Sequence, residues 1–238
     1  MIAEVVSNRK IATATFLMKL KTERQISADP GMFLMVGFDG MDPFLNRPFS
    51  IVDIVKSEVH IIYNLRGRGT RKLSNLASGE IVQITGPWGR AMPKPKGKTI
   101  LVAGGIGVAP MLYYLKSYPS VLMLYGARDA DSLIPVAGYK VTIFTEDGSA
   151  GNKGMVTDGI TDDYDLVIAC GPIPLLARVN AIISKAESWG IFEGRMGCGC
   201  GICLGCVLPG HGRYIRICTE GPAIPLKEVD FESLRHRV

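Results

Sequence analysis

The cysteines of this 238-residue chain are concentrated near its C-terminal end. Five of the six lie within the 21 residues that run from Cys198 to Cys218. Secreted proteins with disulfide bonds usually distribute their cysteines along the chain, whereas a crowded set indicates a metal or cluster site in a reducing compartment. We therefore expect the C-terminal part of the chain to surround a metal centre.

The spacing of these cysteines favours one kind of centre. The pattern C-x4-C-x2-C, followed by a more distant fourth cysteine, is typical of plant-type [2Fe-2S] proteins. It is met by Cys198, Cys203, Cys206 and Cys218. Glycines alternate with the cysteines from Gly197 to Gly205. A loop that wraps closely around a cluster needs the conformational freedom that glycine has.

Two other centres stay open on the sequence alone. Cys200, Cys203 and Cys206 begin the pattern of bacterial [4Fe-4S] proteins, but that pattern needs a fourth cysteine four residues later, followed by proline. Here the fourth cysteine is Cys218, which is followed by Thr219. A structural zinc site could use four of the five thiolates, although such sites usually have two short C-x-x-C pairs. We favour [2Fe-2S], which leaves Cys200 without an assigned role.

Composition excludes several classes of protein. Hydrophobic residues make up 47% and charged residues 21% of the chain, as in ordinary globular domains. The net charge of +5 is mild and no basic run is present, so we expect no nucleic-acid binding. The uncharged run at residues 99–115 is interrupted by three glycines and Pro110, which favours a buried strand, a turn and a helix over a membrane span. We expect a soluble, cytoplasmic protein.

The chain divides into three regions of different texture. Residues 1–95 contain short strand-like runs broken by turns, a pattern typical of an antiparallel barrel or sandwich. Residues 96–190 alternate buried strands with helices, expected at 109–118 and 173–190, and so predict an α/β domain with a parallel sheet. Residues 191–238 form the small cysteine-rich region.

The α/β region contains a candidate phosphate site. Gly104, Gly105 and Gly107 lie between a predicted strand and a helix, where backbone N–H groups and the helix dipole favour a pyrophosphate. The dinucleotide fingerprint G-x-G-x-x-G is not met literally, because Pro110 stands where its third glycine would fall. A second strand ends at Cys170, and the carboxyl ends of parallel strands share one edge of a sheet. A plain tight turn and a buried core cysteine are the simpler interpretations of these two features.

A nucleotide site and an iron–sulfur cluster in one chain imply a third group. Nicotinamide donates two electrons as a hydride, whereas a [2Fe-2S] cluster accepts one at a time, and flavin is the common cofactor that converts between the two. Candidate flavin contacts in the first region are Arg47-Pro48-Phe49-Ser50 and residues 63–70. Without the flavin argument, Arg47 and Arg66 are more simply explained as solvated surface charges.

Seven short motifs occur in the order found in the ferredoxin reductase superfamily, over nearly the whole chain. They are PGMF (30–33), RPFS (47–50), GRGT (67–70), GPWG (86–89), GGIGVAP (104–110), EDGSAGNKGMVTD (146–158) and ACGP (169–172). With the cysteine loop, the chain resembles the iron–sulfur electron transfer subunits of class 1B dihydroorotate dehydrogenases. The resemblance implies a flavin-binding β-barrel at 1–95, a nicotinamide-binding parallel-sheet domain at 96–190 and a [2Fe-2S] subdomain at 191–238.

The resemblance also implies site residues. Those expected to bind FAD are Arg47, Pro48, Phe49, Ser50, Ile62, Tyr63, Asn64, Gly69 and Thr70. Those expected to face NAD(H) are Gly104, Gly105, Gly107, Pro110, Cys170, Gly171 and Pro172, with Cys170 as the catalytic residue. The cluster ligands would be Cys198, Cys203, Cys206 and Cys218. Phe49 and Asn64 depart from the superfamily, which often has Tyr and Arg at these places.

The implied function is electron transfer between NAD(H), FAD, the [2Fe-2S] cluster and a partner subunit. That partner would be an FMN-containing catalytic subunit that oxidises dihydroorotate to orotate in pyrimidine biosynthesis, with two copies of each subunit in a heterotetramer. One alternative is the diaphorase subunit of a sulfhydrogenase or of a ferredoxin–NADP transhydrogenase. An alternative of another class is a non-enzymatic, zinc-binding nucleotide sensor. Arg128 and Asp129 leave the choice between NAD and NADP open, because they offer one partner to each.

Overall fold

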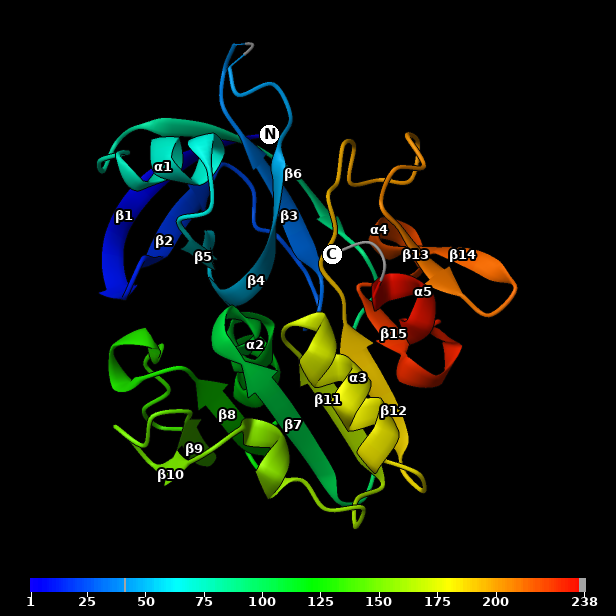
Figure 1. Ribbon diagram of the computed structural model, residues 1–238. Coiled ribbons are helices and arrows are strands. Elements are labelled where there is room, and N and C mark those ends of the chain that lie inside the picture. Colours follow the sequence, from blue (N-terminus) through cyan, green and yellow to red (C-terminus); the bar gives the residue numbers. More distant parts are fainter. Residues whose placement is uncertain (41, 236–238) are drawn as a thin grey trace.

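The N-terminal part of the molecule is a closed β-barrel. The computed structural model describes residues 1–40 and 42–235 (Figure 1). Six antiparallel strands close the barrel in the order β1-β2-β5-β4-β3-β6. The strands are β1 (Ile2–Ala12), β2 (Thr15–Thr22), β3 (Phe33–Gly37), β4 (Arg47–Val55), β5 (Glu58–Asn64) and β6 (Ile81–Trp88), with helix α1 (Arg68–Ser74) between β5 and β6. The antiparallel prediction for this region is confirmed.

The second half is built on a seven-stranded sheet with the order β10-β9-β8-β7-β11-β12-β15. All neighbours from β10 to β12 are parallel, and β15 pairs antiparallel with β12 at the edge. The strands are β7 (Thr99–Gly104), β8 (Leu122–Ala127), β9 (Val141–Thr145), β10 (Asn152–Lys153), β11 (Leu166–Cys170), β12 (Glu187–Ile191) and β15 (Ala223–Pro225). The predicted parallel sheet is therefore confirmed.

Two longer helices and several short ones accompany this sheet. The longer ones are α2 (Val108–Ser117) and α3 (Ile173–Ile182). The short 3-10 helices are η1 (Gly105–Gly107), η2 (Ala130–Ser132), η3 (Val156–Gly159) and η4 (Leu226–Glu228). The uncharged run at 99–115 thus folds as β7, η1 and most of α2. Within the described residues, no helix is both long and apolar enough to cross a membrane.

The predicted helix at 173–190 is wrong in its second half. Helix α3 ends at Ile182, and the chain then forms β12, which pairs with β11 from Leu166↔Glu187 to Cys170↔Ile191. The turn between them is fixed by Asp162, whose carboxylate accepts hydrogen bonds from the backbone N–H of Ser184 (3.1 Å) and its hydroxyl (2.6 Å). The helix-like composition of this segment is overridden by pairing with the buried sheet.

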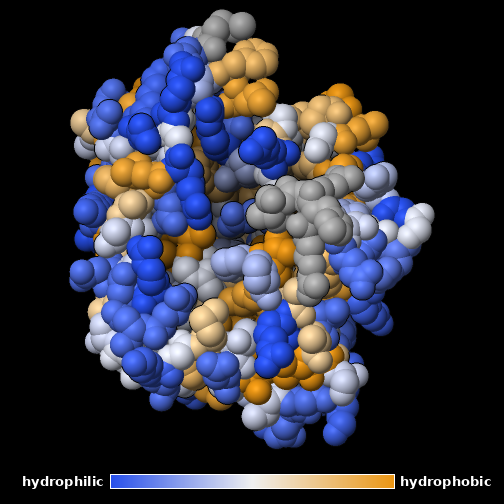
Figure 2. Space-filling model, viewed as in Figure 1, coloured by the Kyte–Doolittle hydropathy of each residue, from blue (hydrophilic) through white to orange (hydrophobic). Residues whose placement is uncertain are grey.

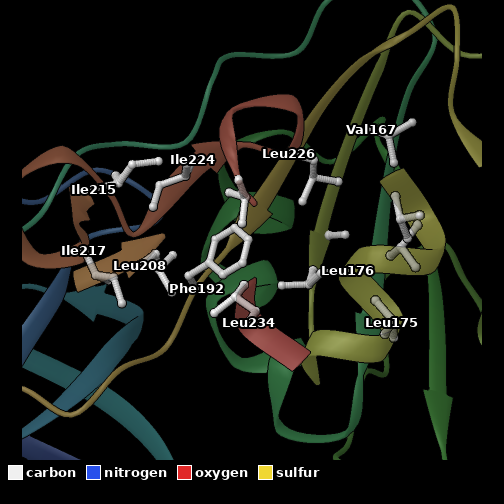
Figure 3. Packing of buried hydrophobic residues seen from close by; sticks show 14 of the residues in the cluster. Val167, Leu175, Leu176, Phe192, Leu208, Ile215, Ile217, Ile224, Leu226 and Leu234 are labelled. Carbon is white, nitrogen blue, oxygen red and sulfur yellow. The ribbon is translucent and has the colours of Figure 1, made fainter. Parts of the chain in front are cut away.

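The C-terminal segment shares its core with the sheet. It contains the hairpin β13 (Val207–Gly210) and β14 (Arg213–Arg216), helix α4 (Ile217–Glu220) and helix α5 (Phe231–Arg235). Figure 3 shows Leu208, Ile217 and Leu234 gathered around Phe192, with Leu176 of α3 beside them. The division at residue 191 stays a prediction, and the hydrophobic core runs across it.

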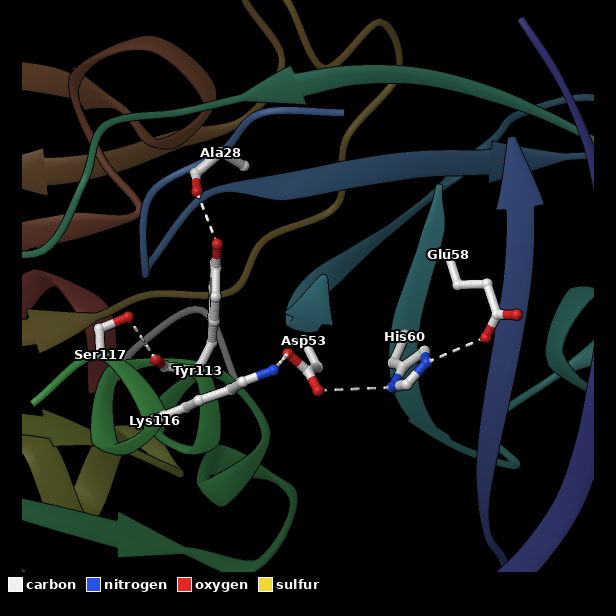
Figure 4. Close-up of polar contacts among 7 residues, drawn as sticks. All are labelled: Ala28, Asp53, Glu58, His60, Tyr113, Lys116 and Ser117. Carbon is white, nitrogen blue, oxygen red and sulfur yellow. Dashed lines mark hydrogen bonds and ion pairs between the residues drawn. The ribbon is translucent and has the colours of Figure 1, made fainter. Parts of the chain in front are cut away.

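Polar contacts also join the barrel to the sheet domain (Figure 4). Lys116 of α2 forms an ion pair with Asp53 of β4 at 2.5 Å, and the Tyr113 hydroxyl donates a hydrogen bond to the carbonyl of Ala28 at 2.9 Å. Asp53 also lies 3.8 Å from Nδ1 of His60, whose pKa is lowered, chiefly by burial. These contacts hold helix α2 against the barrel.

Candidate functional site

Two cavities meet between the barrel and the sheet. The sheet-edge cavity, of about 580 Å³, follows the carboxyl ends of the parallel strands and is lined by residues including Gly104, Arg128 and Gly171. The barrel cavity, of about 400 Å³, lies against β4 and β5. The residues that line both are Asn64, Arg66, Ile106 and Glu193. The two cavities therefore adjoin at these four residues, and ligands bound in them would be neighbours there.

The barrel cavity contains most of the residues predicted to contact FAD. Those that line it are Arg47, Pro48, Phe49, Ser50, Ile62, Tyr63, Asn64 and Thr70. They converge because β4 and β5 are antiparallel neighbours, and α1 follows β5 directly. The rings of Phe49 and Tyr63 lie 5.7 Å apart, and both side chains are buried in the barrel core that lies behind the cavity.

Gly69 and Thr70 have local structural contacts, and their predicted role in binding FAD stays a prediction. Gly69 does not line the cavity, but a Cβ atom there would lie 2.1 Å from Nε of Arg47, so the missing side chain makes room for that guanidinium. The Thr70 hydroxyl accepts hydrogen bonds from the backbone N–H groups of Arg66 (2.8 Å) and Gly67 (3.2 Å). This hydroxyl holds the turn before α1, in addition to lining the cavity.

The glycines of the sheet-edge cavity are required by close packing between β7 and β11. A Cβ atom at Gly107 would lie 2.3 Å from the carbonyl oxygen of Cys170, and one at Gly104 would lie 2.6 Å from Leu175. Gly105 has a φ of +54°. Helix α2 begins directly after these residues and directs its free N–H groups at the cavity, so an anionic pyrophosphate is favoured here. Pro110, predicted to face NAD(H), lines the barrel cavity instead.

Cys170 lies in the core and lines neither cavity. Its side chain is 2% exposed. Burial raises the pKa of its thiol well above the usual value, and the nearby charge of Glu193 raises it further. The thiol is thus protonated and has no open path to either cavity, whereas the next two residues, Gly171 and Pro172, line the sheet-edge cavity as expected. The catalytic role of Cys170 stays a prediction.

Glu193 is a site residue that the sequence did not indicate. It directly follows Phe192, just beyond β12, and is exposed to both cavities. The protein that surrounds the cleft raises the pKa of its carboxyl through desolvation, and Arg66 partly opposes this. In the sequence, only its position, five residues before the first cysteine of the cluster pattern, could have indicated that Glu193 belongs to the site. The segment 191–196 that lines the barrel cavity therefore leads directly into the cysteine loop.

The cysteine loop, residues 194–206, contains no helix or strand and brings the predicted ligands together in two pairs. The backbone N–H of Cys203 donates to Sγ of Cys198 at 3.4 Å, and the Cys218 thiol hydrogen-bonds to Cys206. Hydrogen bonds to Cys203 and Cys200 lower the pKa of Cys198 to about 6. Burial and the contact with Cys206 raise that of Cys218 to about 12. All six cysteines are free of disulfide bonds.

This arrangement fits a [2Fe-2S] cluster. Each iron of such a cluster takes two protein ligands, so the two cysteine pairs match its two irons. Gly199 and Gly201 have φ values of +75° and +93°, which the loop needs to bring its pairs together.

Comparisons with known proteins agree with this site. Residues 193–230 match the model of the iron–sulfur cluster binding domain of dihydroorotate dehydrogenase B. The electron transfer subunit of dihydroorotate dehydrogenase B (NAD(+)) from Caldanaerobacter subterraneus subsp. tengcongensis is 37% identical, with 96% of this chain and 98% of the relative covered. The corresponding subunit of Clostridium acetobutylicum is 34% identical, with 93% of each chain covered. This chain belongs to the family of dihydroorotate dehydrogenase B electron transfer subunits.

Solved structures extend the similarity to this family's fold. A structure of the NADH-dependent reduced ferredoxin-NADP oxidoreductase superposes with a TM-score of 0.88 at 25% identity, over 100% of this chain and 92% of the other. Phthalate dioxygenase reductase superposes with a TM-score of 0.67 at 18% identity, over 100% and 80%. The predicted ferredoxin reductase architecture, with a barrel followed by a nucleotide-binding sheet, is confirmed.

Proposed function

We propose that this chain is the electron transfer subunit of a dihydroorotate dehydrogenase B. It carries electrons between NAD(H), FAD, a [2Fe-2S] cluster and a partner catalytic subunit. That partner contains FMN and oxidises dihydroorotate to orotate in pyrimidine biosynthesis. The observation that carries the proposal is the shared boundary of the two cavities at Asn64, Arg66, Ile106 and Glu193, together with the short segment that leads from there to the first cluster cysteine. We place the complex in the cytoplasm.

The barrel cavity supports FAD as its ligand. Arg47 provides a cation for a phosphate, and Ser50 provides a hydroxyl for the polar edge of the ring. When bound there, FAD supplies the conversion between a two-electron hydride and single electrons. Ile106 at the shared boundary is apolar and keeps water from the region between the two ligands.

The sheet-edge cavity supports NAD(H). Residues 104–107 and the N-terminus of α2 would hold the pyrophosphate, while Gly171 and Pro172 let the nicotinamide ring approach the shared boundary. Glu193 and Arg66 offer a carboxylate and a guanidinium beside that ring. Both can hydrogen-bond a carboxamide, so they would orient the ring toward the barrel cavity.

The cysteine loop supports electron exit to a partner subunit. Ile202 and Leu204 are 82% and 59% exposed and flank Cys203, which is also exposed. In Figure 2 a hydrophobic patch covers the tip of this loop at the upper right of the molecule. Exposed apolar side chains beside a one-electron centre favour a protein partner, because water-exposed apolar area is then buried at the point of transfer. We assign this surface to the FMN-containing subunit, in a heterotetramer with two copies of each chain.

One second candidate is favoured by a specific observation. The TM-score of 0.88 to the NADH-dependent reduced ferredoxin-NADP oxidoreductase structure supports a transhydrogenase subunit as the alternative. The identity of the subunit that copurifies with this chain distinguishes the two candidate functions. The catalytic subunit of a dihydroorotate dehydrogenase supports our proposal, and a glutamate-synthase-like partner supports the alternative.

The proposal is tested by comparing the isolated chain with the complex. Alone, the chain should oxidise NADH with ferricyanide as acceptor but should not turn over dihydroorotate. Co-expressed with its FMN-containing partner, it should couple dihydroorotate oxidation to NAD⁺ reduction. Dihydroorotate turnover by the isolated chain, or a complex that reduces no NAD⁺, would contradict the proposal.

A further inference from the structure

The charged side chains of the sheet-edge cavity lie at its two ends. Arg66 and Glu193 are at the boundary with the barrel cavity, and Arg128 and Glu146 also line the sheet-edge cavity. The strand order separates the two pairs, because Glu146 follows β9, Arg128 follows β8 and Glu193 lies just beyond β12. Strands β9 to β12 are parallel, so all three residues lie at the same edge of the sheet.

This order fixes which half of a dinucleotide each end would hold. Four strand spacings separate β9 from β12, which is about 19 Å and long enough for an extended dinucleotide. The nicotinamide must lie at the Glu193 end, next to the barrel cavity, and the pyrophosphate in the middle at residues 104–107. The adenosine half is then left for the end formed by Arg128, Glu146 and the apolar side chain of Met155.

The acidic residue next to Arg128 in the sequence is not available to this end. Asp129 does not line the cavity. One of its carboxylate oxygens accepts the backbone N–H of Ser132 at 2.9 Å, and the other pairs with Nε of Arg128 at 3.3 Å. Asp129 therefore acts as the N-cap of η2, and its two oxygens already have partners.

Glu146 is the acidic residue that is available at this end of the cavity. Its backbone N–H donates to the carbonyl of Ala127 at 3.1 Å, and the next N–H, of Asp147, donates to the carbonyl of Arg128 at 3.4 Å. Residues 128 and 146 are thus held as neighbours across the ends of β8 and β9. Within the described residues, the Glu146 carboxylate forms no hydrogen bond or ion pair, and the side chain is exposed to the cavity.

We infer that Glu146 is the residue that selects NAD(H) over NADP(H), by accepting hydrogen bonds from the adenosine ribose. This inference rests on the proposed binding of NAD(H). A carboxylate favours the free ribose hydroxyls and repels a 2′-phosphate. Arg128 beside it would favour that phosphate, so the negative charge of Glu146 is what prevents Arg128 from recruiting NADP(H).

The test is the dissociation constants of NAD⁺ and NADP⁺, measured by calorimetry on the oxidised holoprotein. In wild type, NAD⁺ should bind more tightly. Glu146→Gln should weaken NAD⁺ binding by up to about tenfold, since the charged acceptor becomes a neutral amide oxygen, and should strengthen NADP⁺ binding by a similar factor. Adding Arg128→Gln to Glu146→Gln should remove the gained NADP⁺ affinity.

One variant serves as a matched control. Asp147→Asn removes the same charge one residue away, and Asn can still accept the hydrogen bond from the backbone N–H of Ser149. It should leave the ratio of the two dissociation constants within about twofold of wild type.

The outcomes separate the inference from the proposed function. If wild type binds NAD⁺ but the ratio is unchanged in Glu146→Gln, or changes as much in Asp147→Asn, the inference is wrong and the proposed function stands. A wild-type preference for NADP⁺ also overturns the inference. Wild-type protein that binds neither nucleotide overturns the proposed function, and the inference with it.

Discussion

The sheet-edge cavity and the cysteine loop differ in what gives them their shape. The cavity lies at the ends of parallel strands whose residues Leu101, Val102 and Ile168 are fully buried. The cysteine loop has no regular structure and depends on glycines with positive φ and on contacts between its own cysteines. A site built on a packed sheet is formed before its ligand arrives, whereas a loop of this kind takes much of its stability from the metal centre.

The largest effect should come from the cluster ligands. Cys206→Ser should abolish the cluster, so that iron, sulfide and the visible cluster absorbance fall to near zero, because one iron loses half of its protein ligands. FAD content and NAD⁺ affinity should change by less than about twofold, since the cavities are shaped by the sheet and barrel cores.

Cys200→Ser is the matched control, with the same substitution in the same loop, and should keep its iron. If Cys206→Ser retains a full cluster, or if Cys200→Ser loses it, the two-pair assignment is wrong. Loss of iron in Cys200→Ser would favour the C-x2-C-x2-C ligand set.

The next effect tests the rigidity of the sheet edge. Gly107→Ala should lower the free energy of unfolding by about 3 kcal/mol, because its Cβ would lie 2.3 Å from the Cys170 carbonyl and the backbone must shift. Gly105→Ala should cost only about 1 kcal/mol, since its φ of +54° is strained for alanine but nothing lies within 4 Å of the new atom. Denaturant unfolding measures both, and equal costs would contradict a packed edge.

A smaller, pH-dependent effect is expected at Glu193. Its pKa is raised in the folded protein, so the fold disfavours the carboxylate, and stability is lost as the pH rises above the ordinary value of 4.5. Glu193→Gln should therefore have a higher Tm than wild type at pH 8, and the difference should shrink toward pH 5. A variant that is less stable than wild type at pH 8 would show that Arg66 outweighs desolvation.

The smallest effect should be at the contact between the domains. Lys116→Met removes an ion pair with Asp53 that is partly exposed, so the free energy of unfolding should fall by less than about 1 kcal/mol. A double-mutant cycle with Asp53→Asn isolates the pair. A larger loss, or a change in NAD⁺ affinity, would show that this ion pair determines how the barrel is placed against the sheet domain.

The sequence predicted the parts of this molecule that local pattern determines. The strand, glycine turn and helix at 99–117 and the cysteine spacing are local features, so they could be read without knowledge of the fold. The helix predicted at 173–190 was wrong over residues 183–190, because pairing of β12 with β11 outweighed local composition. Neighbours in the fold, and not in the sequence, likewise determine which residues line the cavities.

Glu193 and Glu146 illustrate this limit. Glu193, just beyond β12, lines the same two cavities as Asn64 at the end of β5, and no local motif indicates this. Glu146 faces the nucleotide cavity only because β9 lies beside β8, while Asp129, which the sequence offered for this role, is used as a helix cap. Pro110 lines the barrel cavity, and not the sheet-edge cavity, because α2 packs against β4 of the barrel.

The central claim is that one chain joins a nucleotide site, a flavin and a [2Fe-2S] cluster. Anaerobic titration of the purified protein with NADH, followed by visible absorbance and electron paramagnetic resonance, tests it most directly. We predict one FAD and two iron and two sulfide ions per chain, with the flavin and then the cluster reduced by NADH. A colourless protein that contains zinc, or a cluster that NADH cannot reduce, would contradict the account.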